Sequence, residues 1–102
     1  MTAGWPGVEF RHLAALEAVA TEGSFRGAGV RLGYAQPAIS QQIAALEAAV
    51  GARLVERRRG RGGISLTEAG ELLLAHATEI GQRLRAARGE LSALSAQRPL
   101  TD

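Results

Sequence analysis

The sequence predicts a mainly α-helical fold in which three helices form a core, a two-stranded β-hairpin follows, and a long coiled-coil helix comes last. Three observations support this fold class. Apolar residues recur at steps of three and four along four segments, a basic glycine-rich stretch separates two short β-compatible runs, and the last segment repeats its apolar positions in heptads. With 102 residues, 46% of them hydrophobic, the chain is long enough for one core and too short for two domains.

The first two helices are predicted on either side of a break at Gly23. The first covers about residues 9–21, and its apolar stripe is formed by Phe10, Leu13, Leu16, Val19 and Ala20. Ser24 is suited to cap the second helix, over residues 25–32, because its hydroxyl can accept a hydrogen bond from an unpaired backbone N–H. The buried stripe of that helix is expected to be Phe25, Ala28 and Leu32. Residues 1–8 lack periodicity and predict a flexible leader, with Trp5 docked on the core as the alternative.

The third helix is predicted to begin at Gln36-Pro37 and to end at Gly51. Proline is tolerated in a first helical turn, because the N–H that it lacks has no helical partner there. The core face is expected to be Ile39, Ile43, Leu46 and Val50. The opposite face has no charge and only small or amide side chains, at Gln36, Ser40, Gln41 and Ala44. A solvated helix face normally contains charged residues, so this face is predicted to contact another surface closely.

A hairpin and a long helix complete the predicted fold. Residues 53–57 and 64–66 are short β-compatible runs, and the arginine- and glycine-rich residues 58–63 between them suit a turn. Thr67 is expected to cap a helix over about residues 68–95, which would be roughly 40 Å long. Its heptad positions predict a seam that pairs with another helix: Leu73, Ala77, Ile80, Leu84, Ala87, Leu91 and Leu94. The chain thus divides into a leader (1–8), a core with hairpin (9–66), a dimerisation helix (67–96) and a tail (97–102).

The net charge of +2 is distributed unevenly along the chain. Residues 23–61 contain seven Arg and two Glu, a local charge of +5, whereas the rest contains five Arg and eight acidic residues, a charge of −3. No acidic residue occurs from Gly23 to Leu46, so a polyanion near the third helix would meet no repulsion. Residues 57–61 alone could be an ordinary solvated charge run. Together with the uncharged helix face, they favour a nucleic-acid partner.

Several classes of function are excluded by what the sequence lacks. It has no cysteine, hence no disulfide framework and no thiolate metal site, which fits a cytoplasmic protein. No apolar run approaches the roughly 20 residues that span a bilayer. His12 and His76 are isolated and interpreted as ordinary helix residues, and residues 60–63 lack the ending of a phosphate loop. We therefore expect no enzyme activity, no cofactor and no metal.

An ordered set of motifs extends from Val8 to about Arg88. It comprises Arg11-His12-Leu13, Gly23-Ser24-Phe25 with Ala28 and Leu32, Gln36-Pro37-Ala38-Ile39-Ser40 through Ile43 and Leu46-Glu47, Gly51 with Leu54 and Glu56-Arg57, and Leu66-Thr67-Glu68-Ala69-Gly70. In these positions the sequence resembles the N-terminal DNA-binding domain of LysR-type transcriptional regulators. The resemblance implies a winged helix-turn-helix whose third helix enters the major groove. It also implies a linker helix that pairs antiparallel in a homodimer on an inverted-repeat operator of a bacterial promoter.

The resemblance also implies which residues contact DNA. The start of the recognition helix would contact base edges and phosphates through Gln36, Pro37, Ser40 and Gln41. The DNA backbone and minor groove would be contacted by Ser24, Arg26, Arg57, Arg58, Arg59 and Arg61. The chemistry agrees, because a glutamine amide can pair bidentately with adenine, a proline ring can lie against a thymine methyl, and arginine suits phosphates and narrow minor grooves.

Five positions depart from the family pattern. Ala35 replaces the usual Ser or Thr helix cap, and Gly27 stands where a basic residue is common. Gly29 replaces a packing alanine, which should cost the second helix up to about 1 kcal/mol. Val55 stands where the hairpin usually has Phe, and Gln41 replaces a frequent Arg.

Members of this family normally continue into an effector-binding domain, and this sequence stops at Asp102. We therefore expect a small-molecule inducer to act only on a full-length form. The competing interpretation is a helical protein-interaction module that uses the coiled-coil seam and has an incidental basic loop. The uncharged amide face beside four hairpin arginines argues against it, because such an adaptor has no need of either feature.

Overall fold

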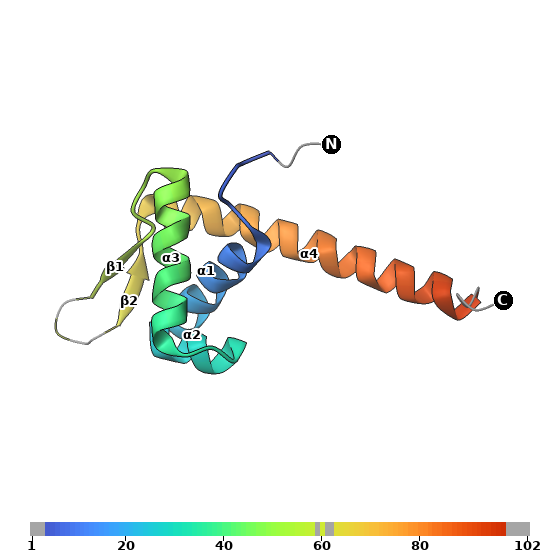
Figure 1. The fold of residues 1–102 in the computed structure, drawn as a ribbon, viewed down its shortest axis with the longest axis horizontal. Helices are drawn as coiled ribbons and strands as arrows, with labels where there is room; N and C mark the ends of the chain where they lie inside the picture. The colour runs from blue at the N-terminus through green and yellow to red at the C-terminus, as the bar shows by residue number, and fades with distance from the viewer. Residues whose placement is uncertain (1–3, 59, 61–62, 98–102) are drawn as a thin grey trace.

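The computed structural model describes residues 4–58, 60 and 63–97 of the chain. This part forms helices α1 (Phe10–Glu22), α2 (Phe25–Leu32), α3 (Gln36–Val50) and α4 (Glu68–Gln97), with strands β1 (Val55–Arg57) and β2 (Ile64–Leu66) between α3 and α4. Figure 1 shows the three shorter helices and the hairpin gathered at one end, with α4 projecting far beyond them. The molecule is accordingly elongated, with extents of 60 × 29 × 20 Å. The predicted mainly α-helical architecture is confirmed.

Helix α1 is the centre of the core and packs against α2, α3 and α4. Its buried side chains include Leu13, Leu16 and Val19, as the apolar stripe predicts. The prediction that Phe10 belongs to the same buried stripe is wrong: Phe10 is the first residue of α1 and is 61% exposed, because it lines an open hollow beside α4 instead of packing into the core. His12 is buried and its Nδ1 accepts a hydrogen bond from the backbone N–H of Glu9 at 3.1 Å, which completes a capping box at the helix start.

The turn between α2 and α3 packs tightly against α2. The backbone N–H of Tyr34 donates to the carbonyl of Gly29 at 2.8 Å, and Gly33 has a left-handed backbone with φ 78°. A Cβ at position 29 would lie 2.5 Å from the Tyr34 carbonyl oxygen. The sequence predicts only that Gly29 weakens α2, whereas in the structure the turn approaches too closely for any side chain at this position. Ala35 precedes α3 without a side-chain cap, as expected.

The hairpin (the wing) is antiparallel and pairs Val55 with Leu66 and Arg57 with Ile64. The sequence predicts that it begins at Arg53, but β1 begins at Val55, because the partner strand ends at Leu66 and the next residue, Thr67, already leads into α4. The Thr67 hydroxyl donates to the Arg53 carbonyl at 2.6 Å, and the Thr67 backbone N–H donates to the Leu54 carbonyl at 3.0 Å. The Thr67 hydroxyl also accepts from the Gly70 N–H at 3.0 Å, so the predicted cap of α4 is confirmed.

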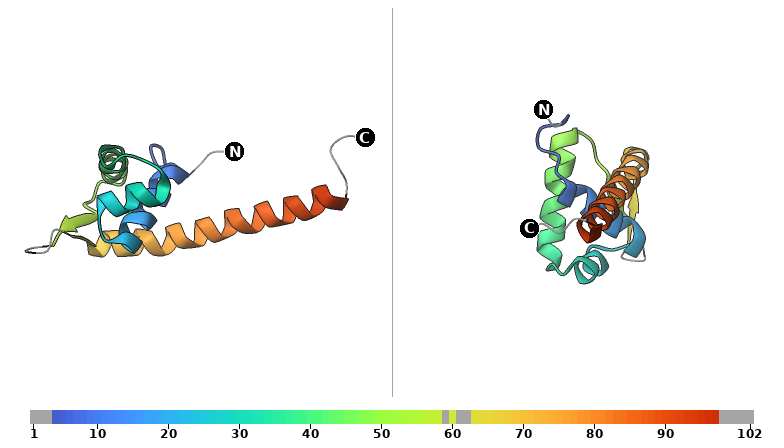
Figure 2. Two further views of the ribbon diagram at one scale, coloured as in Figure 1. Left: turned by 90° about the horizontal axis from the view of Figure 1, so that it is seen from below. Right: turned by 90° about the vertical axis from the view of Figure 1, so that its right-hand side faces the viewer.

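The predicted seam of α4 divides into two parts. Ala77 is 2% exposed within the single chain, and Leu73 and Ile80 are partly buried against the same core. The prediction of a seam open to another helix along its whole length is therefore wrong at Ala77, because α1 packs across the first turns of α4. The other seam residues, Leu84, Ala87, Leu91 and Leu94, are exposed on the half that extends past the domain in Figure 2.

Residues 4–8 turn back toward the domain before α1 begins. The backbone N–H of Val8 donates to the Trp5 carbonyl at 3.1 Å, and Val8 packs against the core. Trp5 itself stays about half exposed. None of the helices in the described ranges combines the length and the apolar character that a membrane crossing requires.

Candidate nucleic-acid interface

The outer face of α3 is exposed and uncharged. Gln36, Pro37, Ser40, Gln41 and Ala44 are all exposed, whereas the residues on the opposite face, Ile39, Ile43 and Leu46, are almost fully buried. The helix is therefore held to the core by one side and presents amides, a hydroxyl and a proline ring on the other. Its side chains are short enough for a second surface to approach the backbone, which confirms the predicted exposure of this face.

Ser24 and Arg26 lie at the start of α2. The Ser24 hydroxyl accepts a hydrogen bond from the Gly27 N–H at 2.9 Å, so its oxygen caps α2 and its proton remains available to a further acceptor. Arg26 is exposed one residue into the helix. The backbone N–H of Ile64 donates to the Gly23 carbonyl at 2.8 Å, which ties the second strand of the wing to this turn. The α2 start and the wing base are thereby adjacent.

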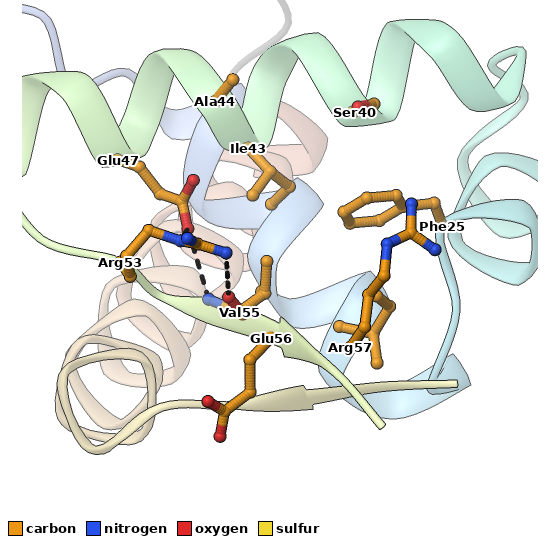
Figure 3. Close-up of a pocket in the computed structure, with 10 residues that line it drawn as sticks. Phe25, Ser40, Ile43, Ala44, Glu47, Arg53, Val55, Glu56 and Arg57 are labelled. Carbon is orange, nitrogen blue, oxygen red and sulfur yellow. Dashed lines mark hydrogen bonds and ion pairs between the residues drawn. The ribbon is translucent and has the colours of Figure 1, made fainter. Parts of the chain in front are cut away.

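Glu47 joins α3 to the wing. Its carboxylate accepts hydrogen bonds from the backbone N–H groups of Leu54 at 2.8 Å and Val55 at 3.3 Å. The Arg53 guanidinium lies 3.7 Å from the same oxygen and donates to the Val55 carbonyl at 3.4 Å (Figure 3). The Glu47 side chain is only 19% exposed and accepts hydrogen bonds from two backbone N–H groups. These charge-assisted bonds therefore fix the position of the wing relative to α3. Glu47 belongs to the family pattern, but the sequence alone predicts no role for it.

Gly70 closes the base of the wing from the other side. A Cβ at position 70 would collide with the Leu54 carbonyl oxygen, so α4 begins in close backbone contact with the segment that enters β1. The wing is thus attached to α3 by Glu47, to α4 by Thr67 and Gly70, and to the α1–α2 turn by Gly23. These attachments define how the wing is oriented relative to the exposed face of α3.

Arg57 and Arg58 are exposed on the wing. Figure 3 shows the Arg57 side chain directed from β1 toward α3, and Phe25, Ser40 and Arg57 line one cavity of about 180 Å³ between wing and helix. The Arg58 N–H donates to the Gly63 carbonyl at 2.9 Å where the strands separate. The other two predicted wing residues, Arg59 and Arg61, lie outside the described residues.

The exposed arginines differ in their electrostatic partners. Arg31 lies 3.5 Å from a Glu22 carboxylate oxygen, which offsets its charge locally. Within the described ranges, Arg26, Arg57 and Arg58 form no ion pair. The structure therefore brings three uncompensated cations into the same part of the molecule as the uncharged face of α3. That combination of positive charge and close-approach surface suits a polyanion.

Comparison with known proteins identifies the family. The family model described as "Bacterial regulatory helix-turn-helix protein, lysR family" matches residues 10–71. The chain belongs to this family. It is 43% identical over 96 residues to the HTH-type transcriptional regulator TcbR of Pseudomonas sp. (strain P51), which covers 86% of this chain and 32% of that protein. A second relative, the uncharacterized regulator YnfL of Escherichia coli (strain K12), is 45% identical over 73 residues, covering 72% of this chain and 24% of YnfL.

The lysR-family fold is also found in solved structures. The CbnR DNA-binding domain in its DNA complex is 40% identical, with a TM-score of 0.73 over 87% of this chain and 99% of that chain. The match with CbnR covers nearly all of that solved domain, so the described helices and wing correspond to a lysR-family DNA-binding domain. The chain spans about a quarter to a third of the length of the curated relatives TcbR and YnfL.

Proposed function

We propose that this lysR-family domain binds double-stranded DNA sequence-specifically and serves as the DNA-binding part of a bacterial transcriptional regulator. The observation that supports this most is the exposed uncharged face of α3, held by Glu47 beside the exposed wing arginines. The relatives are named as transcriptional regulators, and the similar CbnR domain was solved as a DNA complex. We place the domain in the bacterial cytoplasm on this basis.

In the proposed complex, α3 enters the major groove and its first turns approach the bases. Gln36 and Gln41 offer amide donors and acceptors to base edges, Ser40 offers a hydroxyl, and Pro37 offers an apolar ring to a thymine methyl. Five arginines are proposed to contact phosphates or the minor groove: Arg26, Arg57, Arg58, Arg59 and Arg61. The free hydroxyl proton of Ser24 suits a phosphate oxygen.

The regulator is proposed to act as a homodimer through α4. Leu84, Leu91 and Leu94 are exposed along the half of α4 that extends past the domain, and a second copy of the helix would cover them. A twofold dimer presents two α3 helices and therefore suits an inverted-repeat operator. In a full-length regulator, a small-molecule inducer would act through a further domain.

Replacement of Gln36 tests the proposed base contact. The specific duplex for this test is the site that a footprint of the domain identifies in the promoter region next to its own gene. Gln36→Ala should lose about 1–3 kcal/mol of binding free energy on that site and almost none on random DNA. Gln82→Ala, at an exposed position of α4, is the matched control and should leave both unchanged. Equal losses on both duplexes would show that Gln36 positions the protein without recognising a base.

A protein-interaction module is the second candidate, because the exposed leucines of α4 also fit a foreign helix. The two functions differ in salt dependence. DNA binding should weaken steeply as salt rises, with a slope set by the number of phosphates contacted, whereas an apolar helix pair should be nearly insensitive to salt. A domain that binds no duplex at low salt would favour the second candidate.

A further inference from the structure

Arg57 lies on the face of the wing that is turned toward α3. Side chains alternate between the two faces of a strand, so Arg57 shares a face with Val55, which is only 6% exposed, and Glu56 belongs to the other face. Figure 3 shows this arrangement, with Glu56 directed away from α3 and Arg57 directed toward it. Because Arg57 is exposed, it lies where the inner face of the wing meets solvent.

The register of the hairpin brings Arg57 close to the start of α2. Arg57 pairs with Ile64 across the two strands, and the Ile64 backbone N–H donates to the Gly23 carbonyl at 2.8 Å. Phe25 follows Gly23 by two residues and is partly buried against the core. Phe25 and Arg57 line the same cavity of about 180 Å³, and in Figure 3 the guanidinium of Arg57 points toward the Phe25 ring. Two segments that are far apart in the sequence thus place a cation beside an aromatic ring.

No carboxylate forms an ion pair with Arg57 within the described part of the chain. The Glu47 carboxylate accepts two backbone N–H groups and lies 3.7 Å from Arg53, and Glu56 is directed to the opposite face of the hairpin. An aromatic face attracts a guanidinium through its quadrupole and does not neutralise the charge. A ring can therefore keep the Arg57 side chain in one position while its full charge stays available to an anion.

We propose that Phe25 is a positioning residue for DNA binding, whose ring keeps the Arg57 side chain at the gap between the wing and α3. This inference rests on the proposed function, in which α3 enters the major groove and Arg57 contacts the DNA beside it. An arginine loses rotamer entropy when it is fixed in a complex, and a side chain that a ring already supports loses less of it on binding. Arg58 does not line this cavity and has no such support from Phe25.

A double-mutant cycle tests whether Phe25 acts through Arg57. Phe25→Leu keeps an apolar side chain against the core but removes the ring face. It should weaken binding to the footprinted duplex about two- to fivefold, as the loss of an exposed cation–π contact predicts. In the Arg57→Ala background the same substitution should leave the affinity unchanged, because the ring then has no cation to support. Phe25→Tyr restores the ring and should restore the affinity.

Arg58→Ala provides the matched control for this cycle, since Arg58 is the neighbouring exposed arginine and does not line the cavity. The losses caused by Phe25→Leu and Arg58→Ala should add. If Phe25→Leu loses the same factor with and without Arg57, the positioning role is refuted, because the substitution then acts through the stability of α2. A gain in affinity for Phe25→Leu would also contradict the proposal, since the ring would then withhold Arg57 from DNA.

Nuclear magnetic resonance of the domain without DNA tests the contact itself. Protons above an aromatic ring are shifted upfield by its ring current, so the δ-methylene protons of Arg57 should resonate upfield of those of Arg58. Phe25→Leu should remove this difference. Equal chemical shifts for the two arginines in the unmodified chain would refute the contact between Phe25 and Arg57.

The two measurements distinguish failure of this inference from failure of the proposed function. A domain that binds no duplex at low salt contradicts DNA binding, and with it the role of Phe25, whatever the Arg57 signals show. A domain that binds DNA, with losses from Phe25→Leu and Arg57→Ala that add and with unshifted Arg57 signals, retains the proposed function and refutes the role of Phe25 alone.

Discussion

Replacing Glu47 with alanine should loosen the wing from α3 and destabilise the domain. The substitution removes the acceptor for two backbone N–H groups, and one of them belongs to Leu54, whose side chain is buried. A hydrogen bond to a charged group contributes about 1.5–3 kcal/mol, and a buried donor left without an acceptor costs a similar amount. The Arg53 side chain is 78% exposed, so its ion pair with Glu47 adds at most about 1 kcal/mol.

We therefore expect Glu47→Ala to lower the free energy of unfolding by about 2–4 kcal/mol. Glu47→Gln keeps an acceptor oxygen of nearly the same shape and should cost about 1 kcal/mol. Urea unfolding followed by circular dichroism at one fixed protein concentration measures both, since the proposed dimerisation would make stability depend on concentration. Glu56→Gln, at an exposed carboxylate of β1, is the matched control and should stay within about 0.5 kcal/mol of the unmodified chain. A Glu47→Ala variant as stable as that control would refute the link between helix and wing.

Two further predictions concern the helix turn and the wing. Gly29→Ala should destabilise the domain by about 1–3 kcal/mol in the same urea assay, because the new Cβ would lie too close to a backbone carbonyl oxygen. Gly89→Ala lies in an open part of α4, where the new Cβ would meet no neighbouring group within 4 Å, and should instead stabilise the domain by about 0.5–1 kcal/mol. Equal effects at the two sites would contradict the close approach at Gly29. Replacing both Arg58 and Arg59 with alanine should make DNA binding less dependent on salt, by an amount that corresponds to the loss of up to about two phosphate contacts. An unchanged salt dependence would show that these two residues do not contact phosphates.

The periodic features of the fold were predictable from local sequence. The bounds of α1, α2 and α3 follow from apolar spacing and from glycine at each helix end, and the observed bounds differ from the predicted ones by at most a residue. The uncharged face of α3 followed from the same periodicity. These features depend on residues only three or four positions apart, which is the range over which a helix defines its faces.

What the sequence did not predict depends on contacts between distant segments. Periodicity marks Ala77 as apolar, but only the packing of α1 determines that the same chain covers it. The role of Glu47 depends on backbone N–H groups seven and eight residues away, and that of Gly29 on a carbonyl in the next turn. The sequence contains one indication that Glu47 has a specific role, because it is the first acidic residue after Glu22.

Selection from a pool of random DNA duplexes tests sequence-specific binding by this domain most directly. Duplexes that the dimer retains at physiological salt should be enriched in an inverted repeat, with half-sites separated by about one helical turn. Gln36→Ala should relax the preference at one position of each half-site while leaving the spacing unchanged. A retained pool with the same base composition and spacing as the starting pool would contradict recognition of bases by α3.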